Sequence, residues 1–101
     1  MSTRFPVENI GAPAVNLTDY SGQTAAGQSI QIMPANPAAR LYRLQNLSDS
    51  VSLWFNDTGA PAAAKAAGSY ELVPGAYYEF SSPCAVSVYA DAAITFSAAR
   101  Y

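Results

Sequence analysis

Histidine is missing from this 101-residue chain. Its absence removes the commonest general base, the commonest metal ligand and the usual sensor of physiological pH. A Ser-His-Asp triad is therefore impossible, and any catalytic site would have to use Tyr, Ser, Asp or Glu alone. The sequence also contains neither a phosphate-binding glycine loop nor a dinucleotide fingerprint. We therefore expect a protein that is not an enzyme and that uses no cofactor and no metal.

Cysteine occurs once, as Cys84. One cysteine excludes both an internal disulfide framework and a cysteine-based zinc cluster. Because Cys84 lies in an apolar run, we expect a small buried hydrophobe rather than a reactive thiol. No apolar run approaches the ~20 residues of a transmembrane helix, and residues 1–6 lack the apolar core of a signal peptide. We expect synthesis in the cytoplasm.

Charge is also scarce, since only 12% of residues are charged and the net charge is −2. That fraction is about half the usual one. Binding to nucleic acid needs clustered Lys and Arg to neutralise phosphates, whereas the five cationic residues are spread along this chain. The composition favours a surface that docks against other proteins and predicts binding to neither nucleic acid nor membrane.

What the chain does contain is a series of short runs that alternate apolar and polar residues, separated by Gly, Pro, Asn, Asp and Ser. Alternation with period two is typical of strands, and no stretch has helical periodicity of any length. We predict an all-β protein, a small antiparallel β-sandwich that is jelly-roll-like rather than immunoglobulin-like, with about eight short strands. The expected strands are residues 14–18, 28–33, 40–47, 51–56, 69–73, 77–80, 84–90 and 93–98.

The centre of the predicted fold is a hairpin within residues 35–57, in which a tight polar turn joins strands 40–47 and 51–56. A second hairpin is expected around Pro74-Gly75, a strong turn signal. Residues 60–68 are alanine-rich and are expected to form an exposed loop with helical tendency. Residues 20–27 are expected to form a loop.

Alternation also predicts which side chains face inward. Trp54 is out of phase with its apolar neighbours and should lie on the outer face, either as a contact surface or packed on loop 60–67. Tyr89 and Ser87 should likewise point outward. The residues expected to point inward are Val51, Leu53, Phe55, Cys84, Val86, Val88, Ile94 and Phe96.

Two groups of residues are candidates for ligand chemistry. Glu71 and Glu79 would face each other across the second hairpin, and we interpret them as solvated rim carboxylates rather than a catalytic pair. The aromatic residues Tyr70, Tyr77, Tyr78 and Trp54 leave a carbohydrate-binding module open as an alternative, although aromatic residues also pack well on strands for purely structural reasons.

Protein contacts are expected at the remaining cations and aromatics. Arg40 and Arg43 are three residues apart, so they should point to opposite faces of their strand. Tyr77 joins them as a contact candidate. Residues 1–13 are expected to form an arm ahead of a single domain spanning 14–101. The arm is either a frayed tail or a segment that orders on a neighbour, and in the second case the anchors would be Arg4, Phe5 and Val7.

Several short motifs follow one another between residues 28 and 100. They are Ala35-Asn36 before Arg40, Gln45-Asn46 before Ser48, Gly68-Ser69, Leu72-Val73, Pro74-Gly75 before Tyr77-Tyr78, and Pro83 before Val86, Val88 and Ala90. This series resembles small virion-associated proteins of tailed bacteriophages, and residues 1–27 have no counterpart in it.

The resemblance implies a capsid decoration (cement) protein with a β-sandwich fold that packs as a homo-oligomer, a dimer or trimer. Its partner would be the major capsid protein or another virion protein, and its location the virion. A tail, neck or fibre component of the same particle is the alternative virion role. None of the motifs in the resemblance is catalytic.

Overall fold

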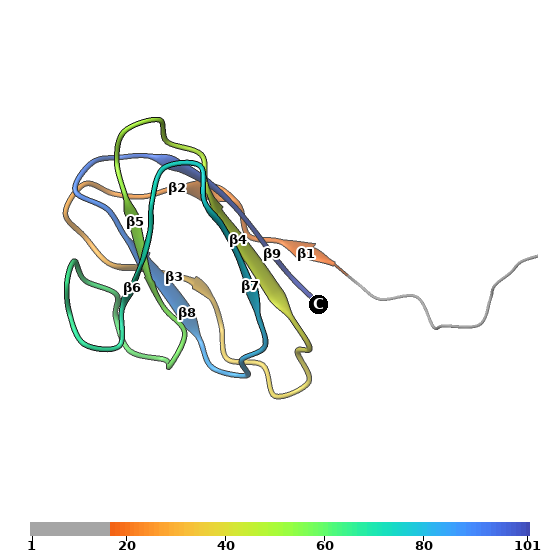
Figure 1. The fold of residues 1–101 in the computed structure, drawn as a ribbon. Helices are drawn as coiled ribbons and strands as arrows, with labels where there is room; N and C mark the ends of the chain where they lie inside the picture. Colours follow the sequence, from red (N-terminus) through yellow and green to blue (C-terminus); the bar gives the residue numbers. More distant parts are fainter. Residues whose placement is uncertain (1–16) are drawn as a thin grey trace, which may run out of the picture.

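The computed structural model of the chain describes residues 17–101, and within this range every regular element is a β-strand (Figure 1). The predicted arm anchors Arg4, Phe5 and Val7 lie outside the described residues. The strands are β1 (Thr18–Asp19), β2 (Gly22–Gln23), β3 (Ile30–Met33), β4 (Tyr42–Asn46), β5 (Leu53–Asn56), β6 (Tyr70–Leu72), β7 (Tyr77–Phe80), β8 (Val86–Tyr89) and β9 (Thr95–Arg100).

The strands form two antiparallel sheets that face each other. One has the order β1-β9-β4-β7, with β2 also pairing with β9, and the other has the order β3-β8-β5-β6. Between β2 and β9 the chain crosses to the opposite sheet at every connection except the one from β5 to β6. This alternation between a five-stranded and a four-stranded layer is the jelly-roll arrangement, so the predicted fold class is confirmed.

Both predicted hairpins are wrong. β4 pairs with β7 and β9, whereas β5 pairs with β6 and β8, so the two strands of the central segment lie in different sheets. β6 and β7 are separated in the same way. The carboxylates of Glu71 and Glu79 therefore do not face each other across a ladder, since Glu71 pairs with Trp54 and Glu79 with Arg43.

Asn46 explains why the chain crosses between sheets after β4 instead of turning back. Its buried amide nitrogen donates to the carbonyl oxygens of Val51 (2.8 Å) and Leu72 (2.9 Å), and its amide oxygen accepts from the Ser48 N–H (2.9 Å). Ser48 Oγ in turn accepts from the N–H groups of Ser50 and Val51. The polar turn residues thus bond their own backbone as expected, but they shape an arch between the layers.

The core lies between the sheets and follows the alternation of the sequence. Tyr42, Leu44, Phe96 and Ala98 enter it from the first sheet, and Met33, Leu53, Phe55, Leu72, Val86 and Val88 enter it from the second. The inward positions predicted for strands β5, β8 and β9 are confirmed, with Val51 only half-buried. Ile94 is also buried, although it precedes β9.

Arg100 is an unexpected member of the interior, because it is 3% exposed. Its guanidinium donates to three backbone carbonyl oxygens, those of Pro34 (2.6 Å), Ser82 (2.7 Å) and Cys84 (2.8 Å). Nearby, the Tyr42 hydroxyl donates to the Asp57 carboxylate at 2.5 Å. This polar end of the sandwich ties the connections between the sheets to β9 and β4.

Other local predictions need correction. The loop expected at residues 20–27 contains β2, because β9 offers backbone partners to this segment. Residues 14–16 of the strand expected at 14–18 lie outside the described residues, and β1 begins at Thr18, where it pairs with β9. Residues 60–68 form a loop, as predicted, but the helical tendency produces no helix: the loop makes two successive turns, closed by Ala66 N–H to Ala63 C=O and Ser69 N–H to Ala66 C=O.

Two side chains near β8 also differ from expectation. Ser87 is on the outer face, as predicted, but it is buried. We attribute its burial to the loop after β5, which is held against this face by hydrogen bonds to Ser29 beside β3 and to Asn56 on β5. Cys84 precedes β8 and is half-buried rather than buried.

Candidate functional site

The outer face of the first sheet carries a groove along β9. In register, Asp19 and Arg43 flank Ala99, and Gln45 flanks Ser97. The residues of β9 on this face are small, whereas those on β4 and β7 are large, so a hollow of about 230 Å³ forms over β9. We call it the β9 groove; its side chains are Asp19, Ser21, Arg43, Gln45, Tyr77 and Ser97.

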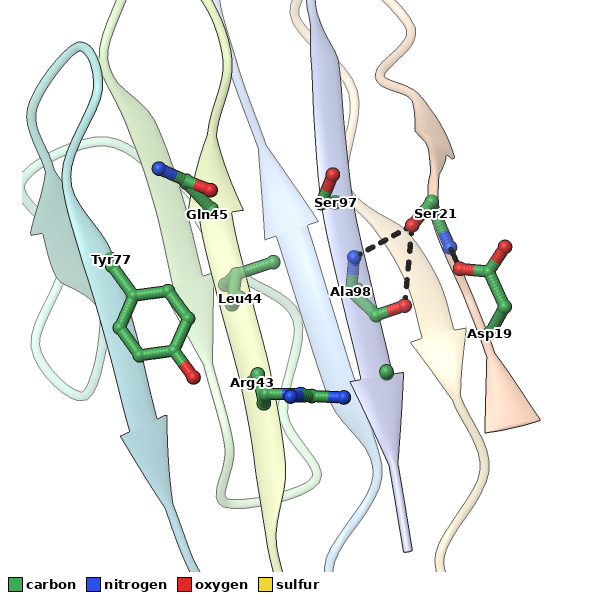
Figure 2. Close-up of a pocket in the computed structure, with 9 residues that line it drawn as sticks. Asp19, Ser21, Arg43, Leu44, Gln45, Tyr77, Ser97 and Ala98 are labelled. Carbon is green, nitrogen blue, oxygen red and sulfur yellow. Dashed lines mark hydrogen bonds between the residues drawn. The ribbon is translucent and has the colours of Figure 1, made fainter. Parts of the chain in front are cut away.

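Figure 2 shows how these side chains are arranged. Arg43 extends from β4 across the sheet towards β9, and Tyr77 lies beside it on β7 with the flat face of its ring turned outward. Asp19 stands on the opposite wall. Tyr77 is 53% exposed, and within residues 17–101 no hydrogen bond engages its hydroxyl, the Arg43 guanidinium or the Ser97 hydroxyl.

Ser21 fixes the wall of the groove that carries Asp19. Its hydroxyl accepts from the Ala98 N–H (2.9 Å) and lies 3.3 Å from the Ala98 carbonyl oxygen, while its own N–H donates to Asp19 Oδ1 (3.0 Å). The hydrogen bonds from Ser21 lower the pKa of Asp19. The groove therefore presents a carboxylate on one wall and a guanidinium on the other at neutral pH.

A second feature is a cluster of aromatic rings at one open side of the sandwich. β6 and β7 are the last strands of their sheets on this side. The ring of Phe55 lies 5.9 Å from that of Tyr70 and 4.8 Å from that of Tyr78, and Tyr78 lies 6.1 Å from Phe80. We call these four residues the edge cluster.

The edge cluster is partly open to solvent. Tyr70 and Phe80 pair with the buried Phe55 and Tyr42, so they occupy inward-facing positions of their strands. No further strand of residues 17–101 covers them, and they remain 60% and 54% exposed. Val73, in the connection between β6 and β7, is 52% exposed. Aromatic surface beside two unpaired strand edges is typical of a protein interface.

Trp54 lies on the outer face of the second sheet, as predicted. It lines a separate hollow of about 330 Å³ together with Ala64, Lys65 and Glu71. Trp54 thus faces the alanine-rich loop, which was one of the two alternatives for it. Two carboxylates here accept hydrogen bonds, since Ser52 Oγ donates to Glu71 Oε2 (2.6 Å) and the Tyr89 hydroxyl donates to Asp91 Oδ1 (3.1 Å).

The structure brings some predicted contact residues together and separates others. Arg43 and Tyr77 share the β9 groove. Trp54 and Tyr89 are cross-strand neighbours on the opposite sheet. Arg40 lies before β4, where it is exposed and its N–H donates to the Tyr101 carbonyl oxygen.

The four aromatic residues proposed as a sugar platform do not form one surface. Tyr77 faces outward from the first sheet and Trp54 outward from the second, while Tyr70 and Tyr78 belong to the edge cluster between them. A single platform built from all four is therefore excluded.

Sequence reasoning missed Asp19, Ser21, Gln45 and Ser97 as groove residues. Gln45 follows Arg43 by two residues, so the alternation of β4 places both on one face and could have identified it. The other three reach the groove only because β1 and β9 pair with each other beside β4, and such pairing leaves no local signal.

Within residues 17–101, acidic and cysteine side chains nowhere gather in a group of three that could hold a metal. No helix of this part of the chain is long and apolar enough to cross a membrane. No protein-family model, curated protein or solved structure matches the chain.

Proposed function

We propose that this chain is a structural virion protein that binds the outer surface of a phage capsid as a homo-oligomer and stabilises the shell. The observation that carries the proposal is the edge cluster, whose two outer rings are more than half exposed in a chain of low charge. Large aromatic side chains contribute most of the binding energy of many protein interfaces. The order of motifs between residues 28 and 100 supports a virion role.

The role of the edge cluster follows from its position. An aromatic side chain that points into a sandwich normally loses its contact with water, but Tyr70 and Phe80 keep it because β6 and β7 end their sheets. A neighbouring protein that covers this side would bury both rings. On a capsid, many copies bind at once, so modest affinity at each contact is sufficient for stable attachment.

The test compares phage particles assembled with and without the protein. We expect a copy number comparable to that of the capsid subunits, and earlier heat-induced release of DNA when the protein is absent. A handful of copies at one vertex would contradict the decoration role and would support a tail, neck or fibre component.

Variants connect this test to the edge cluster. Tyr70→Ser combined with Phe80→Ser should abolish attachment to particles that lack the protein, because both exposed rings are lost. Leu47→Ser is the matched control, since Leu47 is a 47% exposed apolar residue outside the cluster. Equal attachment of the double variant and the control would remove the edge cluster from the proposal.

A further inference from the structure

We propose that the β9 groove is a binding site for a single uncharged pyranose ring of a glycan. This goes beyond the virion role and does not depend on it. It assigns a ligand class to a hollow of residues 17–101 that combines an exposed aromatic ring with polar side chains. Of the four aromatic residues considered as a sugar platform, the structure selects Tyr77.

The dimensions of the groove fit a single ring. Asp19 and Arg43 lie on strands either side of β9, so their backbones are separated by two strand spacings, roughly 10 Å. The volume of about 230 Å³ lies below the roughly 300–1,000 Å³ of sites for drug-sized ligands. It is larger than an ion or a few waters would need, because each water takes about 30 Å³.

Tyr77 supplies the surface on which the ring would stack. Tyr77 lines the groove, and Figure 2 shows the face of its ring turned outward from the sheet. The negative face of an aromatic ring attracts polarised C–H groups, and a pyranose presents such groups on its faces while its hydroxyls project around the rim. Trp54 is a larger ring, but it is partly buried and less exposed than Tyr77.

The polar groups match the hydroxyls at the rim. Arg43 offers donors only, whereas Asp19 offers acceptors and has one carboxylate oxygen, Oδ2, beyond the one bonded to Ser21. Ser97 offers both. A sugar hydroxyl both donates and accepts, so it can satisfy either wall of the groove.

Charge selects an uncharged ring over an acidic one. Arg43 lies in register between Ala99 and Glu79, and Asp19 stands on the other side of Ala99. A carboxylate on the sugar would gain one cation but approach two anions. We therefore expect glucuronate to bind more weakly than the corresponding neutral hexose.

The experiment titrates the full chain, labelled with ¹⁵N, with methyl glucoside, methyl galactoside, N-acetylglucosamine and glucuronate. A hexose has about twelve non-hydrogen atoms, so ordinary ligand efficiency predicts a dissociation constant of a few millimolar, on the order of 1–10 mM. Saturable shifts of the Ser21, Ser97 and Ala99 amide signals by at least one neutral sugar would support the proposal.

Two variants assign the binding to the groove. Tyr77→Ala should weaken it at least tenfold, and Arg43→Gln should also weaken it. Tyr70→Ala is the matched control, because Tyr70 is similarly exposed but lies in the edge cluster, and it should bind as the parent does. The amide signals of the core should overlay in all three variants, which shows that each is folded.

Three results would overturn the proposal. The first is that no neutral sugar produces saturable shifts in the groove at a concentration ten times the expected dissociation constant. The second is unchanged sugar affinity in Tyr77→Ala. The third is tighter binding of glucuronate than of the neutral sugars. Because Tyr70 and Phe80 lie outside the groove, loss of capsid attachment and loss of sugar binding are separable outcomes.

Discussion

Replacing Arg100 by methionine tests the interpretation that a buried guanidinium holds one end of the sandwich together. Methionine keeps an unbranched side chain in the interior but removes all three hydrogen bonds to the carbonyl oxygens of Pro34, Ser82 and Cys84. Those carbonyl oxygens belong to the connections β3–β4 and β7–β8, so the substitution releases both connections from β9.

The magnitude follows from two opposing effects. A hydrogen bond to a charged group contributes about 1.5–3 kcal/mol, so losing three costs about 5 kcal/mol or more. Removing the cation also removes the free-energy cost of taking it out of water. This cost is only partly offset in the parent, because all three partners are uncharged carbonyl oxygens and Nε has no partner among the described residues. We expect a net loss of about 3 kcal/mol, a large part of the roughly 5–15 kcal/mol typical of a chain this size.

The assay is urea denaturation of the parent and of Arg100→Met, with the free energy of unfolding extrapolated to water. Arg43→Met is the matched control, since Arg43 lies on the outer face and its loss should change stability by less than about 0.5 kcal/mol. Arg100→Lys separates charge from geometry. Lysine keeps the charge but not the planar fork, so it should restore little of the loss.

The result that would refute this reasoning is equal stability of Arg100→Met and the parent within about 0.5 kcal/mol. Full rescue by lysine would show instead that the charge matters and that the arrangement of the three donors does not.

Three further outcomes are expected. Asn46→Ala should destabilise the protein by about 3 kcal/mol in urea denaturation, since it leaves two carbonyl oxygens and one N–H without their partner; a loss below about 1 kcal/mol would mean that water replaces the amide. Lys65→Gly should raise the free energy of unfolding by about 0.5–1 kcal/mol because Lys65 has φ 56°, whereas Lys65→Ala, which keeps a Cβ, should be neutral. Burial and, after it, the hydrogen bond to Asp57 raise the pKa of Tyr42 in the folded state. This contribution to the free energy of unfolding should therefore be fully present below the unfolded-state pKa of about 10, and should fall above it by up to about 1.4 kcal/mol per pH unit. Tyr42→Phe should show a shallower alkaline decline in urea midpoints, and an identical decline would contradict the assignment.

The sequence predicted much of the fold because side-chain alternation in a strand is local. Alternation with period two is sufficient to place one set of side chains outward, with Trp54, and the other inward, with Leu53, Phe55, Ile94 and Phe96. The same period places Arg100 inward, four residues after Phe96, yet its charge argues for exposure. Only the structure supplies the reason for its burial, which is the group of carbonyl oxygens from two distant connections.

Strand pairing was not predictable in the same way. A polar turn between two strands is compatible with a hairpin and with an arch between sheets, and the flanking alternation is identical in both. What decides between them is Asn46, whose amide reaches Val51 and Leu72 at once, a contact that exists only after β4, β5 and β6 have assembled.

The sequence by itself thus determined most of the strands, which of their faces are apolar, and that the chain contains no histidine for catalysis or metal binding. The tertiary structure alone decided which strands are neighbours. It thereby placed Asp19 opposite Arg43 across β9, and it left Tyr70 and Phe80 uncovered at the ends of their sheets. The physical reason is that alternation fixes the direction of a side chain relative to its own strand, whereas a site depends on pairings between segments tens of residues apart.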